Sequence, residues 1–180
     1  RVGVTIFVGG QIYGNAAFLM SFAIPILTMK LISEERRGMT LPFLFSAPIS
    51  ITEIVVGKFL GLLIFLSILV IYIFIMLATM NIWADIDFGY LLANSFGLIL
   101  LISSFVALGT FFSSLTSQPI ISAVLSFIAL IALMMAGRYY ASAPDHWFNH
   151  ISLLRHYQSF SKGIIESAGI VYFLLFTLTF

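Results

Sequence analysis

Long apolar runs separated by short polar stretches set the organisation of this chain. The complete runs cover residues 11–29, 59–80, 88–115 and 119–136, and a last run begins at residue 169. None of them contains Asp, Glu, Lys or Arg. A helix needs about 20 apolar residues to cross a bilayer, so each complete run is long enough for one span. The pattern predicts an all-α, polytopic helical membrane bundle, with a single transmembrane domain over residues 1–180.

Composition narrows the class of protein further. Apolar residues make up 61% of the chain and charged residues 8%, whereas a soluble domain carries roughly 25% charged residues. The spans leave no room for a nucleotide-binding domain. A net charge of +1 is too small for a nucleic-acid surface, and the absence of cysteine excludes disulfides and thiolate metal sites. We expect a multi-pass membrane protein that contacts membrane lipid and binds no nucleic acid, while the absence of cysteine leaves its compartment undecided.

The two ends of the sequence indicate a fragment. The chain starts with Arg1 instead of Met, and its last apolar run stops at Phe180, short of the length of a span. We therefore expect that a first span and the end of a last one are missing.

Residues 30–58 gather charge between the first two runs, and they bear on orientation. Lys and Arg prefer cytoplasmic loops, but their number is equal on the two sides of the membrane, so this count does not decide the orientation of the chain. The adjacent Arg36 and Arg37 favour a cytoplasmic position for residues 30–58, because the cations of the other side are scattered among aromatic residues. Asp85 and Asp87, in a short turn, fit an external loop.

Local signals predict how this charged loop is built. The first span is expected to continue as a helix through residues 33–37, with Gly38 in the left-handed conformation that ends many helices. Arg36 and Arg37 would then lie in the last turn, where the helix dipole favours cations.

The second span is predicted to begin with a capping box, in which Ser50 and Glu53 each satisfy an orphan backbone donor. Ile49 and Ile54 would add a hydrophobic staple. The intervening residues 40–48 are apolar, and Pro42 suits the first turn of a helix. Two interpretations stay open: an ordinary charged flank of a span, or an ordered segment that docks onto another protein.

Residues 137–167 form a long aromatic segment that holds all three histidines, His146, His150 and His156. Together with Asp145 they offer the three or four ligands of a zinc site, as one alternative. The favoured interpretation is an external interfacial segment, because tyrosine and tryptophan gather at membrane surfaces. It predicts one or two short amphipathic helices that cap the outer end of a translocation path. The aromatic residues concerned are Tyr139, Tyr140, Trp147, Phe148, Tyr157 and Phe160.

The polar groups inside the spans are hydroxyls and amides, for which interhelical hydrogen bonds and close packing are the expected roles. Ion-driven transporters keep ionisable residues in the membrane, so a self-powered pump is disfavoured and a partner must supply any energy. Phosphate-binding loops and catalytic motifs are absent, so we assign no catalytic, metal or cofactor-binding residue. An intramembrane enzyme built on Ser103 and a histidine is a weak alternative. The polar residues are Asn94, Ser103, Ser104, Thr110, Ser122 and Ser126.

Several sequence blocks, in order, resemble the membrane-spanning subunit of ABC-2-type exporters, and most closely the permeases associated with gliding motility and with nitrous oxide reductase maturation. The resemblance extends from about residue 25 to residue 172. Its blocks are Pro25 with Thr28 and Met29, SEERRG at 33–38, Thr40, SAPIS at 46–50, EIVVGKFLG at 53–61, SSLTSQPIISAVLSF at 113–127 and YQSFSKGII at 157–165.

This resemblance implies a permease of six spans, of which about five are present, that pairs with a second permease subunit as a homo- or heterodimer. Two cytoplasmic ATPase subunits would bind ATP and Mg, and this chain would hold no cofactor. Residues 30–58 would then be the cytoplasmic coupling loop, although Pro42 replaces a glutamate that is usual in the family. The residues that correspond to the coupling region are Glu34, Glu35, Arg36, Arg37, Gly38 and Thr40.

The expected function is therefore a non-catalytic permease subunit of the cell membrane, inner or plasma, that couples ATP hydrolysis by its partner to transport. The alternative is a membrane scaffold or assembly factor without a transport cycle. An ATPase encoded beside this chain would favour the permease.

Overall fold

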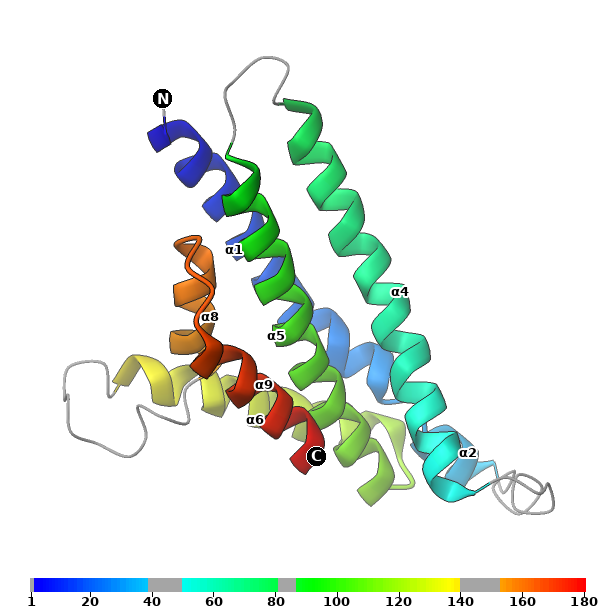
Figure 1. The fold of residues 1–180 in the computed structure, drawn as a ribbon. Helices are drawn as coiled ribbons and strands as arrows, with labels where there is room; N and C mark the ends of the chain where they lie inside the picture. Colours follow the sequence, from blue (N-terminus) through cyan, green and yellow to red (C-terminus); the bar gives the residue numbers. More distant parts are fainter. Residues whose placement is uncertain (1, 39–49, 81–86, 140–152) are drawn as a thin grey trace.

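The structure is a computed structural model that describes residues 2–38, 50–80, 87–139 and 153–180. Every regular element in these ranges is a helix, and the helices form one bundle (Figure 1). This confirms the predicted all-α helical membrane bundle. The helices are α1 (Val2–Thr28), α2 (Ser33–Arg37), α4 (Ile51–Thr79), α5 (Phe88–Leu115), α6 (Pro119–Tyr139), α8 (Leu153–Ser161) and α9 (Ser167–Thr179).

Three segments are long and apolar enough to cross a membrane: Gly9–Arg37, Ile51–Thr79 and Phe88–Leu115. Pro119–Met135 and Ser167–Thr179 are shorter apolar helices. Each predicted run is thus a helix, and α5 has the predicted bounds. Helix α4 begins at Ile51, directly after the predicted Ser50 cap, and so extends about two turns before the apolar run at residues 59–80.

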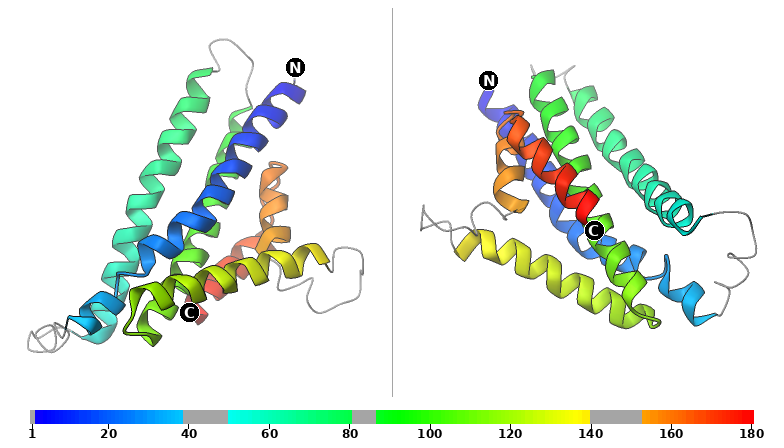
Figure 2. Two further views of the ribbon diagram at one scale, coloured as in Figure 1. Left: turned by 180° about the vertical axis from the view of Figure 1, so that it is seen from behind. Right: turned by 60° about the horizontal axis from the view of Figure 1, so that its bottom comes forward.

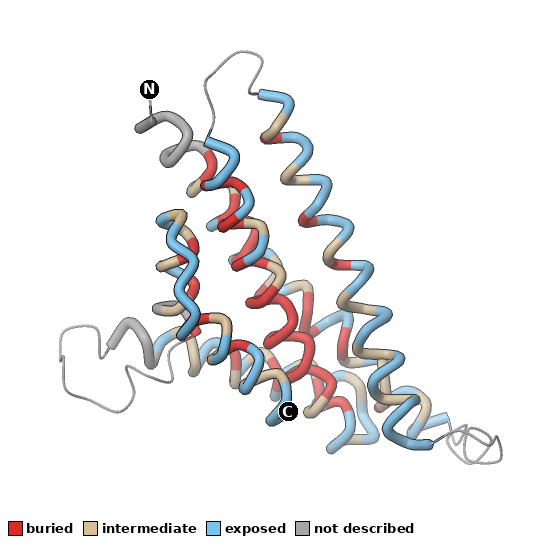
Figure 3. Tube along the Cα trace, viewed as in Figure 1, coloured by how far each residue is buried: buried red, intermediate tan, exposed pale blue. Residues whose placement is uncertain are grey.

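Helix α5 lies at the centre of the bundle and packs against α1, α4, α6, α8 and α9. Most of its side chains are buried, as the red trace in Figure 3 shows. Two of its glycines allow this close packing. A Cβ on Gly97 would lie 2.5 Å from Phe160 Cβ, and one on Gly109 would lie 2.8 Å from Thr28 Cβ. Small residues at these points let neighbouring helices approach α5, as in other membrane bundles.

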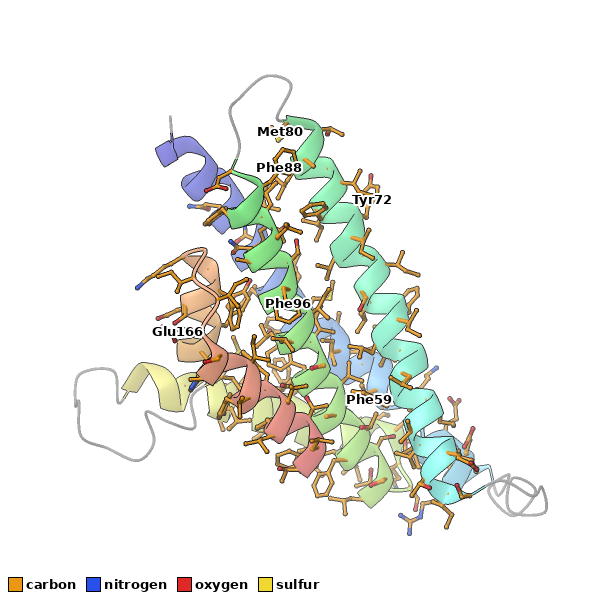
Figure 4. The ribbon with its side chains drawn as sticks, in the orientation of Figure 1. Phe59, Tyr72, Met80, Phe88, Phe96 and Glu166 are labelled. Atoms are coloured by element: carbon orange, nitrogen blue, oxygen red, sulfur yellow. The ribbon has the colours of Figure 1, made fainter. Side chains whose placement is uncertain are left out.

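Helix α4 lies at the edge of the bundle, which the further views in Figure 2 also show. It packs mainly against α5, and many of its large apolar side chains are exposed. Tyr72 points away from the bundle (Figure 4) and is 68% exposed. Apolar side chains that face lipid tails lose no hydrophobic stabilisation, so this exposure agrees with a membrane-embedded helix.

The bundle has two distinct ends (Figure 1). At one end lie α2, the beginning of α4 and the short connection between α5 and α6. This end is named here the α2 end. The beginning of α1 and the beginning of α5 lie at the opposite end.

Candidate functional site

Helix α2 does not continue α1, so the predicted unbroken helix through residue 37 is wrong. A turn at residues 29–32 separates the two helices. In a continuous helix, the amides of Ile32 and Ser33 would bond to carbonyls four residues earlier. Instead both donate to the Ser113 hydroxyl, each at 3.1 Å. The Ser113 hydroxyl thus replaces the helical acceptors, and the chain turns at this point.

The end of α2 also differs from its prediction. Gly38 has φ −78°, so the left-handed conformation expected there is wrong. Its amide donates to the Glu34 carbonyl at 2.8 Å, which is an ordinary helical bond that requires no special conformation. Arg36 and Arg37 do lie in the last turn of α2, as predicted.

Helix α2 is attached to the C-terminal end of α5. The buried Ser113 hydroxyl accepts the two amides and itself donates to the Met29 carbonyl at 3.2 Å. Arg36 Nη1 donates to the Ser114 carbonyl at 2.8 Å. That carbonyl belongs to the last turn of α5, where the helix dipole is negative and favours a cation.

A second attachment joins α2 to α4. Lys58 of α4 forms an ion pair with Glu35, and its Nζ also donates to the Leu31 carbonyl. The side chains of Lys58 and Glu35 are only 23% and 29% exposed, so water screens this pair less than a surface pair. Helix α2 is therefore held against both α4 and α5.

These contacts divide the predicted coupling residues into two groups. Glu35 and Arg36 bond to α4 and α5, whereas Glu34 and Arg37 are exposed on the surface of α2. Thr40 lies outside the described residues, as do Pro42 and Ile49, so the predicted apolar segment and hydrophobic staple stay predictions.

Sequence reasoning missed Lys58, Ser113 and Ser114 as partners of α2. The sequence did point to Lys58, since it is the only cation in α4 and a cation in a largely apolar helix usually has a partner. No signal of this kind pointed to Ser113, because a serine that bonds within its own helix and a serine that bonds to another helix look alike in sequence.

The capping box at the start of α4 is confirmed. The Glu53 amide donates to Ser50 Oγ at 3.3 Å, and the Ser50 amide donates to Glu53 Oε2 at 2.8 Å. Two backbone donors that the first turn would leave unpaired are thus satisfied.

We expect Ser50→Ala to destabilise the first turn of α4 by about 1 kcal/mol, because one amide then loses its side-chain acceptor. Hydrogen exchange at residues 52–54 should become faster in this variant. Ser50→Asp keeps an acceptor and should exchange like the native chain. Equal exchange in Ser50→Ala and the native chain would contradict a stabilising role of the cap.

Away from the α2 end, α8 is amphipathic, as predicted for part of residues 137–167, and its apolar side packs into the bundle. Leu153, Tyr157 and Phe160 are buried, and Tyr157 donates its hydroxyl to the Tyr13 carbonyl at 3.3 Å. Burial raises the pKa of the Tyr157 hydroxyl, so it remains a neutral donor. The ring of His156 stacks on Tyr172 of α9, with centroids 4.3 Å apart.

The alternative zinc site falls mainly on His146, His150 and Asp145, which lie outside the described residues. Trp147, Phe148 and Tyr140 lie outside them too. Within the described ranges, no group of three or more histidine, cysteine or acidic side chains is placed to hold a metal ion.

Most polar side chains inside the bundle bond to their own helix, so interhelical hydrogen bonds were overpredicted. The carbonyl one turn earlier is always within reach of a short hydroxyl or amide side chain. Among the described residues, Ser103 is the member of the predicted set that also reaches another helix, with its Oγ 3.3 Å from Thr177 Oγ1 of α9. The buried Ser122 hydroxyl has no hydrogen-bond partner among them. The own-helix bonds are made by Asn94 to Tyr90, Ser103 and Ser104 to Leu100, Thr110 to Ala107, and Ser126 to Ser122.

Comparison with known proteins places this architecture in a family. The model of the family described as ABC-2 family transporter protein matches residues 6–166, a range that includes α2 and all of its attachments to α4 and α5. No curated protein and no solved structure matches the chain. Since the family match covers most of the sequence, the chain belongs to the ABC-2 transporter family.

Proposed function

We propose that this chain is the permease subunit of an ATP-binding-cassette exporter and that α2 receives the movement of a partner ATPase. The observation that carries the proposal is the attachment of a short charged helix to two membrane helices. An ordinary flank of a span needs no such bonds. Here Glu35 and Arg36 bond inward to Lys58 and Ser114, and the exposed Glu34 and Arg37 present charge to a partner.

In this proposal the chemistry belongs to the partner, which binds ATP and Mg and hydrolyses the nucleotide. The permease holds neither and works as a pair with a second permease subunit in the cell membrane, with α2 on the cytoplasmic side. Closure of the ATPase subunits displaces α2, and the displacement changes the packing of α4 and α5. The likeness to the permeases of gliding motility and nitrous oxide reductase maturation rests on the sequence blocks alone.

The test begins with the native chain, co-expressed with the ATPase encoded beside it and purified in detergent. We expect the ATPase to co-purify. The double variant Glu34→Ala with Arg37→Ala should lower its yield several-fold, because charge is removed from the surface offered to the partner.

A matched control removes one acid and one base away from the α2 end of the bundle. Lys162→Ala with Glu166→Ala changes exposed side chains there and should leave the yield of ATPase unchanged. Failure of the native chain to retain any ATPase would favour a scaffold or assembly factor. An equal loss in both double variants would contradict docking at α2.

We expect Glu35→Ala with Arg36→Ala to separate binding from coupling. The variant keeps Glu34 and Arg37, so the ATPase should still co-purify. Helix α2 loses the Glu35–Lys58 pair and the Arg36–Ser114 bond, while the backbone bonds to the Ser113 hydroxyl remain. The stimulation of ATP hydrolysis by the permease should therefore fall several-fold, measured as phosphate release in lipid vesicles. Native stimulation in this variant, with the ATPase bound, would show that these bonds do not transmit movement.

A further inference from the structure

Ser113 differs from the other hydroxyl residues near the end of α5. Thr110 and Ser114 donate to carbonyls of their own helix, at 2.8 and 2.7 Å. The Ser113 hydroxyl has one donor and two acceptor positions. It donates to the Met29 carbonyl and accepts from the amides of Ile32 and Ser33. All three positions are therefore used in bonds to the turn between α1 and α2 and to the first residue of α2.

Gly109 supports the same contact one turn earlier. Residues four apart lie on one face of a helix, so Gly109 and Ser113 face α1 and its turn together. The fully buried Thr28 packs over Gly109 and donates its hydroxyl to the Ile24 carbonyl at 2.9 Å. The end of α1 therefore packs against α5 at Gly109, and the turn that follows bonds to α5 at Ser113.

We propose that Ser113 is a positioning residue for coupling, which fixes α2 to α5 so that the two move as one body. The proposal rests on the proposed function and names the helix that receives the displacement of α2. The far half of α5 contacts α8, where Phe160 covers Gly97 and Tyr90 lies beside Gly163. A displacement at the α2 end thus reaches α8 through one continuous helix.

The first test uses the chain alone and compares Ser113→Ala with Ser104→Ala. Both serines are fully buried in α5, but Ser104 bonds only to the Leu100 carbonyl of its own helix. Hydrogen exchange at the amides of Ile32 and Ser33 should be about tenfold faster in Ser113→Ala and native in Ser104→Ala. Equal exchange in the two variants would overturn the proposal.

The second test measures coupling in the complex with the co-expressed ATPase. The chain has no cysteine, so Gln158→Cys on the exposed side of α8 gives a single reporter for a membrane-impermeant maleimide. ATP with vanadate should change the labelling rate in this background. Ser113→Ala should lose most of that change while ATPase retention stays native, and Ser104→Ala should keep it.

A labelling change that survives Ser113→Ala overturns the Ser113 proposal and leaves the proposed function intact. A native complex that retains no ATPase overturns the proposed function, and the coupling role of Ser113 with it.

Discussion

Gly109→Ala is expected to destabilise the bundle by about 3 kcal/mol, the upper part of the range for overpacked cores. The new Cβ would lie 2.8 Å from both Cβ and Cγ2 of Thr28. Thr28 cannot turn away, because it is fully buried and its hydroxyl is bonded to the Ile24 carbonyl. The end of α1 must therefore move off α5. Thermal unfolding in detergent, followed by helix content, measures the loss.

Gly61→Ala on α4 is the matched control. A Cβ at Gly61 meets nothing within 4 Å, and alanine favours a helix over glycine by about 1 kcal/mol. This variant should unfold at the native temperature or slightly above it. Hydrogen exchange near the turn at residues 29–32 should increase in Gly109→Ala only. If the two glycine variants unfold alike, α1 and α5 are not packed as closely as described.

Gly97→Ala should have an effect of similar size, about 3 kcal/mol, at the other half of α5. Its Cβ would lie 2.5 Å from Phe160 Cβ and 2.7 Å from Cγ. The clash is with the Cβ of Phe160, which a shorter apolar residue at position 160 would also carry. A change of the side chain alone therefore cannot relieve the clash, and α8 as a whole must shift. We expect faster trypsin cleavage after Lys162, measured by mass spectrometry of the fragments.

The two α5 variants should increase hydrogen exchange in different regions of the chain. Gly97→Ala should increase exchange in α8 and leave the turn at residues 29–32 native, and Gly109→Ala should do the reverse. Gly57→Ala, on an open part of α4, should change neither region. Increased exchange in both regions from either substitution would indicate general unfolding instead of a local clash.

Much of this fold could be predicted from hydropathy, because an apolar run of span length folds as a helix in lipid whatever its neighbours are. Helix α5 shows this, with observed bounds equal to the predicted ones. The break between α1 and α2 could not be predicted in this way. It depends on Ser113, which lies 80 residues further along the chain than Ser33. A tertiary hydrogen bond overrides a local helical preference there.

The candidate site, too, could be predicted from the sequence only in part. The charged block at residues 33–38 marked the position of α2 in sequence. The different roles of its side chains depend on partners in other helices, such as Lys58 for Glu35. The capping box was predictable, since Ser50 and Glu53 interact only with their own turn.

The central position of α5 has a consequence for biosynthesis. Among the described residues α1 and α4 make almost no contact with each other, and both pack against α5. When the ribosome has synthesised the chain as far as residue 80, α1 and α4 therefore still lack the helix that both pack against, and the Lys58 contacts to Glu35 and Leu31 join only their ends. The packing of α1 and α4 into one bundle requires α5, which is synthesised last of the three.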